Sequence, residues 1–247
     1  MNTRELEVET ADGVLRAFAA LPDGGGRHPA VLVAQEAFGV NHYIRQVCER
    51  FASEGFVAVA PELFHRAGDG IVVGYDELAK AMPMLARIDD RMLETDLRAT
   101  LAAMRLRTEV DPARVGVVGF CMGGYAAFLA ACRTDVASAV SFYGGGVAVA
   151  RPGSKRATLL GEVPAIHAPL LLLFGGKDTS IPAEQIESTR AALQAAGKVH
   201  EVVVYPEAQH GFHCDARATY DAESAADAWT RALHWLRRTM PREAPAE

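Results

Sequence analysis

The sequence predicts an α/β domain with a mostly parallel central sheet, helices on both faces and an N-terminal β-hairpin. Short apolar runs, typical of strands buried on both faces, alternate with longer segments of helical periodicity. Because parallel strands are joined by right-handed crossovers, this alternation favours one sheet covered by helices on both sides. The length of 247 residues suits a single domain of this class, which we place over residues 1–240.

The predicted elements follow the chain from its N-terminus. Two β-like runs within residues 4–20 are separated by Ala11-Asp12-Gly13, and the Asp-Gly step predicts the hairpin. Largely apolar runs then predict buried strands at 30–34, 56–60, 114–120, 137–143, 169–174 and 200–205. Apolar residues at helical spacing predict helices at 42–54, 89–107, 122–133, 183–196 and 219–239.

Residues 62–88 and 144–166 interrupt this alternation. Both have weak periodicity, carry Gly, Pro and mixed charge, and directly follow a predicted strand. Loops in that position reach the carboxyl edge of a parallel sheet, where ligands usually bind. We therefore expect these two segments to form the walls of a pocket. Residues 241–247 are expected to be disordered.

Composition and charge limit the classes of partner. The net charge of −6 offers no electrostatic support for binding nucleic acid or an anionic membrane surface. No apolar stretch is long enough to cross a bilayer, and the N-terminus lacks the layout of a secretory signal. The four cysteines show no metal-ligand spacing, and free thiols fit a reducing compartment. We therefore expect a cytoplasmic protein that binds no metal.

The strongest chemical signal is the run Gly119-Phe120-Cys121-Met122-Gly123-Gly124, between a predicted strand and a predicted helix. It has the form of a nucleophile elbow, in which glycines permit a sharp strand-to-helix turn and leave the central side chain over the sheet edge. The start of a helix also favours a thiolate. Cys121 is therefore the candidate nucleophile. Cys48 and Cys132 lie in helical patterns and are expected to be core residues.

A base and an orienting acid follow at the next strand ends. His210 comes after strand 200–205, and Asp178 comes after strand 169–174. A loop Asp alone usually just caps a turn, but the chain order nucleophile, acid, histidine is the order that α/β-hydrolases use. The sequence therefore predicts the α/β-hydrolase fold with a Cys121–His210–Asp178 triad. Three other histidines could line the pocket without a further role: His65, His167 and His213.

These motifs resemble the dienelactone hydrolases, a family within that fold. The resemblance covers roughly residues 15–237 and rests on GFCMGG at the elbow, AQEAFGVN at 34–41, GGKD at 175–178 and QHGF at 209–212. Cysteine in the elbow together with QE-x-FG-x-N is specific to this family. The resemblance implies hydrolysis of a carboxylic ester or lactone, with no cofactor or metal.

The resemblance also assigns residues around the nucleophile. It implies that Glu36 lies beside Cys121 and helps to ionise it once substrate arrives; alternatively, Glu36 is a strand-end glutamate held by a loop amide. It implies an oxyanion hole formed by the backbone N–H groups of Ala37 and Met122, which would stabilise a developing negative charge. Phe38 is expected to contact the substrate.

The sequence departs from the family at its substrate-binding arginines. The family has an arginine four residues after the catalytic histidine, which holds the substrate carboxylate and can also hold the glutamate away from the thiol; here that position is Cys214. We therefore expect this contact to be weaker or absent, with Cys121 partly ionised even without ligand. Arg217 is the nearest candidate substitute. For a second arginine, Arg66 is a candidate by region, as are Arg87 and Arg91.

The expected function is hydrolysis of an ester or lactone through a cysteine acyl-enzyme. The first alternative is a broad-specificity carboxylesterase for neutral esters on the same scaffold. The second is a non-catalytic small-molecule binding protein, against which the intact set of Cys121, His210 and Asp178 argues. We expect a small-molecule ester or lactone as partner, no nucleic acid or membrane, and a monomer or small homo-oligomer.

Overall fold

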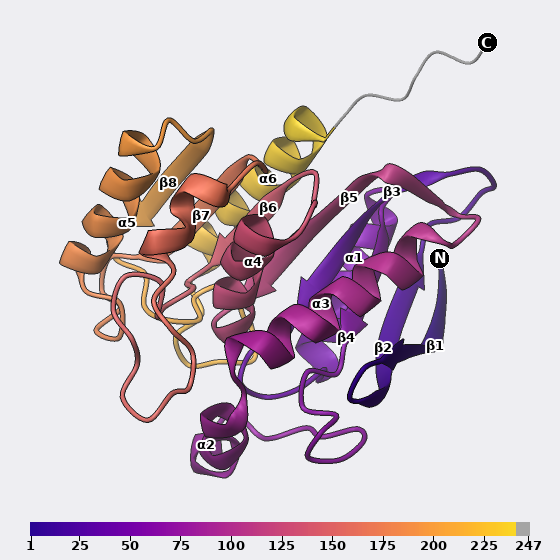
Figure 1. Cartoon of the computed structure of the whole chain (residues 1–247), viewed down its shortest axis with the longest axis horizontal. Helices are drawn as coiled ribbons and strands as arrows, with labels where there is room; N and C mark the ends of the chain where they lie inside the picture. The colour runs from indigo at the N-terminus through magenta and orange to yellow at the C-terminus, as the bar shows by residue number, and fades with distance from the viewer. Residues whose placement is uncertain (241–247) are drawn as a thin grey trace.

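The computed structural model describes residues 1–240, so the disorder predicted for residues 241–247 lies outside the described range. Strands and helices alternate along most of the chain (Figure 1). The strands are β1 (Asn2–Thr10), β2 (Gly13–Leu21), β3 (His28–Ala34), β4 (Val57–Pro61), β5 (Val110–Phe120), β6 (Ala139–Phe142), β7 (Leu170–Gly175) and β8 (His200–Tyr205). The helices are α1 (His42–Ser53), α2 (Leu78–Arg87), α3 (Asp90–Arg105), α4 (Met122–Arg133), the 3₁₀ helix η1 (Leu160–Ala165), α5 (Ala183–Ala195) and α6 (Ala222–Thr239).

The strands form one sheet of eight, in the order β1-β2-β4-β3-β5-β6-β7-β8. β1 and β2 make the predicted hairpin, with Thr10 opposite Gly13 at its turn, and β2 also pairs antiparallel with β4. All pairs from β4 to β8 are parallel. In Figure 1, α3, α4 and α5 lie in front of this sheet and α1 and α6 behind it. The predicted α/β-hydrolase fold, with helices on both faces, is confirmed.

Burial explains why the central strands lack polar alternation. Every residue of β4, β6 and β7 is buried, because helices cover both faces of the sheet there. α4 is buried almost all round, from Met122 to Cys132, which fits its run of Ala, Phe and Leu. None of the helices within residues 1–240 combines the length and apolar character that a bilayer span requires.

The two irregular segments contain short helices that periodicity did not predict. α2 occupies the end of segment 62–88, and η1 lies within segment 144–166. α2 buries only Ala81, and Pro83 interrupts its run of helix formers, which explains why periodicity did not predict it. Several predicted bounds also shift; α6, for example, begins at Ala222 because Asp221 caps it, with its side chain accepting from Ser224 N.

Candidate active site

Cys121 lies at the junction of β5 and α4, in strained backbone. Its φ of 55° and ψ of −111° lie in a region that residues with a Cβ rarely occupy. Two glycines permit this turn: a Cβ on Gly119 would lie 1.8 Å from Gly123 O, and one on Gly123 would lie 2.1 Å from Ala34 O. The Cys121 sulfur is thereby held at the N-terminus of α4, as the glycine pattern predicts.

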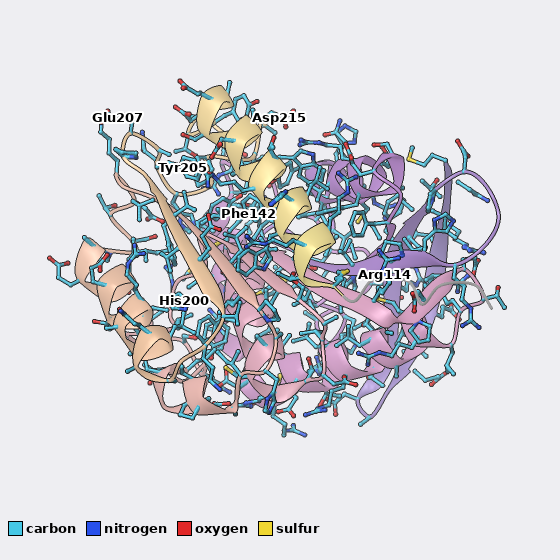
Figure 2. All side chains as sticks on the ribbon, turned by 90° about the horizontal axis from the view of Figure 1, so that it is seen from above. Arg114, Phe142, His200, Tyr205, Glu207 and Asp215 are labelled. Carbon is cyan, nitrogen blue, oxygen red and sulfur yellow. The ribbon has the colours of Figure 1, made fainter. Side chains whose placement is uncertain are left out.

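The loops after β7 and β8 bring Asp178 and His210 to Cys121. Figure 2 marks the two ends of β8 by His200 and Tyr205, and the His210 loop leaves from the Tyr205 end. His210 Nε2 lies 3.1 Å from Cys121 Sγ, and His210 Nδ1 lies 2.6 Å from Asp178 Oδ2. The structure therefore joins the three side chains that the sequence places at successive strand ends.

Ser180 holds the Asp178 carboxylate in position. Its backbone N–H and its hydroxyl both donate to Asp178 Oδ1, at 2.8 and 2.6 Å. The Asp178 side chain is 1% exposed. Because both carboxylate oxygens are engaged in a nearly dry environment, the direction of the Asp178 side chain is fixed and so is that of the imidazole it contacts.

Charge interactions shift the ionisation of all three groups. Burial by itself raises the pKa of the Cys121 thiol, but the charge and hydrogen bond of His210 outweigh it, so this pKa lies below its usual value. Burial lowers the pKa of His210, whereas the Cys121 charge and the Asp178 hydrogen bond raise it, to about 10 overall. Burial raises the pKa of Asp178, and the contacts from His210 and Ser180 more than reverse this. These directions favour a thiolate beside an imidazolium.

Glu36 follows β3 and is completely buried. Arg217 Nη1 donates to Glu36 Oε1 at 3.3 Å, and the Arg217 guanidinium lies 5.6 Å from the centroid of the Phe38 ring. Burial raises the pKa of Glu36 and the Arg217 charge opposes this rise. The arginine contact that was expected to be weaker or absent is therefore present. Arg217 supplies it, while the Cys214 thiol is buried and donates to Tyr75 Oη at 3.1 Å.

A cavity of about 950 Å³ reaches the Cys121 side chain. It is walled by α2 and by the loop that follows β6, so the two irregular segments do form pocket walls. The cavity is also lined by most of the residues expected at the site: Ala37, Phe38, Cys121, Met122, Asp178, His210 and Arg217. The first backbone N–H groups of a helix have no partner within that helix, and Met122, at the start of α4, lines the cavity.

Arg66 does not belong to this cavity. Its guanidinium contacts the carboxylates of Asp12 and Asp96, each at 2.7 Å, and these two partners neutralise it. Arg87 and Arg91 are also absent from the described lining of the cavity. The prediction of Arg66 as a second substrate arginine is therefore wrong, because Asp12 and Asp96 bind its guanidinium and it does not line the cavity.

Two arginines that sequence reasoning missed do line the cavity. Arg151 and Arg156 lie in the loop after β6, within the segment predicted to be a pocket wall. Only their position in that segment could have pointed to them, because its periodicity is too weak for the direction of a side chain to be inferred.

The other thiols and two of the histidines considered for the pocket, His65 and His213, occupy closed environments, whereas the third, His167, is exposed and is not among the described residues that line the cavity. Cys48 and Cys132 are buried in α1 and α4, as predicted, and burial raises the pKa of both, that of Cys132 to about 12. His213 Nδ1 lies 2.6 Å from Tyr43 Oη, and His65 Nε2 lies 3.2 Å from Asp96. Neither histidine is among the described residues that line the cavity.

Comparison with known proteins decides the family. The model of the "Dienelactone hydrolase family" matches residues 15–240. The chain belongs to the dienelactone hydrolase family. A relative from Yersinia pestis, named "Putative carboxymethylenebutenolidase", is 40% identical over 240 residues, which cover 94% of this chain and 86% of that protein. A relative of the same name from Methylorubrum extorquens is 37% identical over 95% of this chain and 80% of its own length.

A solved structure agrees with this assignment. The crystal structure described as "Putative Dienelactone Hydrolase" from Klebsiella pneumoniae is 35% identical and superposes with a TM-score of 0.85. The match covers 96% of this chain and 100% of that one. As a dienelactone hydrolase family member, the chain is a hydrolase that acts on carboxylic esters or lactones.

Proposed function

We propose that this dienelactone hydrolase family member cleaves its ester or lactone through a covalent acyl-enzyme on Cys121. The observation that carries the proposal is the 3.1 Å contact between Cys121 Sγ and His210 Nε2. On the other side of the same ring, His210 Nδ1 lies 2.6 Å from Asp178 Oδ2. A thiolate is the reactive form of cysteine, and a neighbouring imidazolium stabilises it. The lowered pKa of Cys121 and the raised pKa of His210 support this pairing.

The proposed reaction has two half-reactions. Cys121 Sγ attacks the carbonyl carbon, and the carbonyl electron pair moves to oxygen, where the backbone N–H groups of Ala37 and Met122 stabilise the charge. The intermediate collapses to a thioester and expels the alcohol oxygen, which takes the proton of His210. Water then attacks the thioester and returns a proton to His210. Loss of the Cys121 thiolate releases the carboxylic acid.

Asp178 is proposed to orient His210, and Glu36 to adjust the charge beside the thiol. Asp178 keeps Nδ1 protonated, so that Nε2 faces the sulfur. The Glu36 carboxylate accepts a hydrogen bond from Arg217, and its charge raises the pKa of the Cys121 thiol. Phe38 and Arg217 are proposed to contact the substrate, since both line the cavity. The four free thiols fit a reducing compartment, so we place this activity in the cytoplasm.

The proposal is tested by activity of the purified protein on dienelactone and on neutral 4-nitrophenyl esters. Cys121→Ala should abolish hydrolysis of every substrate that the wild type cleaves, because Cys121 Sγ is the nucleophile at His210 Nε2, whereas the Ser180 hydroxyl lies on the Nδ1 side of the ring. His210→Ala should lower the acylation rate roughly a hundredfold or more, the usual loss for a general acid–base group. Cys48→Ala, a buried thiol on α1, is the matched control and should keep near-normal turnover. Substantial turnover by Cys121→Ala would contradict the proposal.

A further inference from the structure

Two guanidinium groups face the cavity without a carboxylate partner among residues 1–240. Arg156 Nη1 donates only to Leu85 O, at 3.3 Å, and its guanidinium lies 5.5 Å from the Tyr125 ring centroid. The Arg151 guanidinium packs on Gly145, where a Cβ would lie 2.0 Å from Nη2. Asp90, whose charge raises the pKa of Arg156, is already engaged by Tyr125 Oη at 2.7 Å and by a backbone N–H. Both arginines thus retain free donors.

Their environment makes this lack of partners costly. Both side chains are partly buried and line the same cavity as Cys121. Burial lowers the pKa of Arg156, and the neighbouring charge of Arg151 lowers it further. Cations that are partly withdrawn from water are normally paired. Guanidinium forks match a carboxylate geometrically, so two of them in one cavity make a site for an anionic group.

The wall of the cavity that α2 forms is apolar. Leu78, Met82 and Leu85 lie four and then three residues apart on α2, so they share one face of the helix, and all three line the cavity. Leu78 and Met82 are 45% and 49% exposed, although Ala81 on the inner side of α2 is buried against the cluster that contains Phe38. Val149, on the loop after β6, lines the same cavity and is 52% exposed. Exposed apolar side chains gathered in this way mark a surface that a ligand covers.

Size points in the same direction. The volume of about 950 Å³ lies near the upper end of the range of roughly 300–1,000 Å³ found for pockets that enclose drug-sized ligands. A cavity of this size holds considerably more than one small lactone ring. The arginines and the apolar wall are also adjacent, because Arg156 donates to the backbone of Leu85 on α2. One molecule can therefore contact both.

We propose that the substrate is an amphipathic acidic ester or lactone, with a carboxylate bound by Arg151 and Arg156 and an apolar chain or ring lying along α2. This inference rests on the proposed function, because it assigns the remainder of the substrate cleaved at Cys121. Arg151 and Arg156 are then specificity-determining residues on the loop after β6. Leu78, Met82 and Leu85 set the preference for a large apolar group.

Direct binding of uncleavable ligands tests both parts without relying on turnover. Calorimetry with wild-type protein compares octanoate, octanamide and butanoate. Octanoate should bind at least about tenfold more tightly than octanamide, because only the carboxylate engages the arginines. Octanoate should also bind at least about tenfold more tightly than butanoate, because the four added methylenes reach α2. Equal binding in either comparison overturns the corresponding part of the proposal.

Variants assign each preference to its residues. Arg151→Gln and Arg156→Gln should each reduce the preference for octanoate over octanamide about tenfold and leave octanamide binding unchanged. Arg151→Gln is the more informative of the two, because Arg151 makes no side-chain hydrogen bond within the described chain. Arg87→Gln, at the exposed end of α2 outside the cavity lining, is the matched control and should bind all three ligands as the wild type does. Unchanged octanoate preference in both cavity variants would refute the arginine site.

The apolar wall has its own variant. Met82→Ser should reduce the preference for octanoate over butanoate severalfold while preserving the preference for octanoate over octanamide. Cys121→Ala should bind octanoate normally although it hydrolyses nothing. Failure of the octanoate preferences with esterase activity intact would remove this inference and leave the Cys121 proposal standing. Hydrolysis by Cys121→Ala would overturn the Cys121 proposal, whereas the binding preferences would still report the anion site and the apolar wall.

Discussion

Arg217 donates a hydrogen bond to Glu36 beside the candidate active site, with 3.3 Å between Nη1 and Oε1. The carboxylate is completely buried, and burial raises its pKa while the Arg217 charge opposes this rise. The charge of Glu36 in turn raises the pKa of Cys121, against the larger lowering effect of His210. Glu36 is therefore held by Arg217, and His210 is the group in contact with the Cys121 sulfur; we propose that Glu36 acts on the thiol through its charge.

Glu36→Gln should therefore lower the apparent pKa of the Cys121 thiol. The substitution removes a negative charge that disfavours the thiolate and leaves the His210 contact in place. The measurement is the pH dependence of Cys121 alkylation by iodoacetamide, followed by mass spectrometry in wild type and variant. A higher thiol pKa in Glu36→Gln would show instead that Glu36 acts as a base on the thiol before substrate binds.

Asp178→Asn should move the alkaline limb of the pH profile of kcat/KM to lower pH. The reactive pair needs a proton on His210, which is retained below its raised pKa of about 10 and lost above it. Removing the carboxylate removes one cause of that rise, so the proton should be lost about one pH unit earlier or more. The rate should also fall roughly a hundredfold or more, because the imidazole is misoriented. A wild-type profile in Asp178→Asn would mean that another group orients His210.

Gly119→Ala should strongly destabilise the protein. The added Cβ would lie 1.8 Å from Gly123 O and 2.9 Å from Gly124 N, both backbone atoms that cannot rotate away. Overpacking of this kind costs about 3 kcal/mol, which thermal unfolding would report as a lower Tm. Gly161→Ala is the control, since nothing lies within 4 Å of its Cβ position and a surface change of this kind stays within about 0.5 kcal/mol. Equal Tm values for the two variants would contradict the close approach at the elbow.

The parts of the site that the sequence predicts are those built by local signals. Gly119 and Gly123 surround Cys121 between a buried strand and a helix, so the turn is specified within a few residues. Asp178 and His210 each follow an apolar strand directly. Because parallel strands end at one edge of a sheet, their order along the chain was enough to bring them to Cys121.

The parts that the sequence did not predict depend on contacts between distant segments. Arg217 reaches Glu36 across 181 positions of sequence, from a loop in which Cys214 occupies the expected place. Arg66 and Arg156 are both arginines in irregular segments, yet acids from the β1–β2 turn and from α3 neutralise only Arg66. α2 buries a single alanine and Pro83 interrupts its pattern, so the helix that forms this wall of the cavity was not predicted.

Trapping the acyl-enzyme tests the central claim most directly. Wild-type protein mixed with excess 4-nitrophenyl ester and quenched in acid during turnover should gain the mass of one acyl group. Peptide mapping should place that group on Cys121, and Cys121→Ala should gain none. The Cys214 thiol, whose pKa burial raises to about 11, should remain unmodified. Acylation of a different residue during turnover, with Cys121 unmodified, would contradict the account.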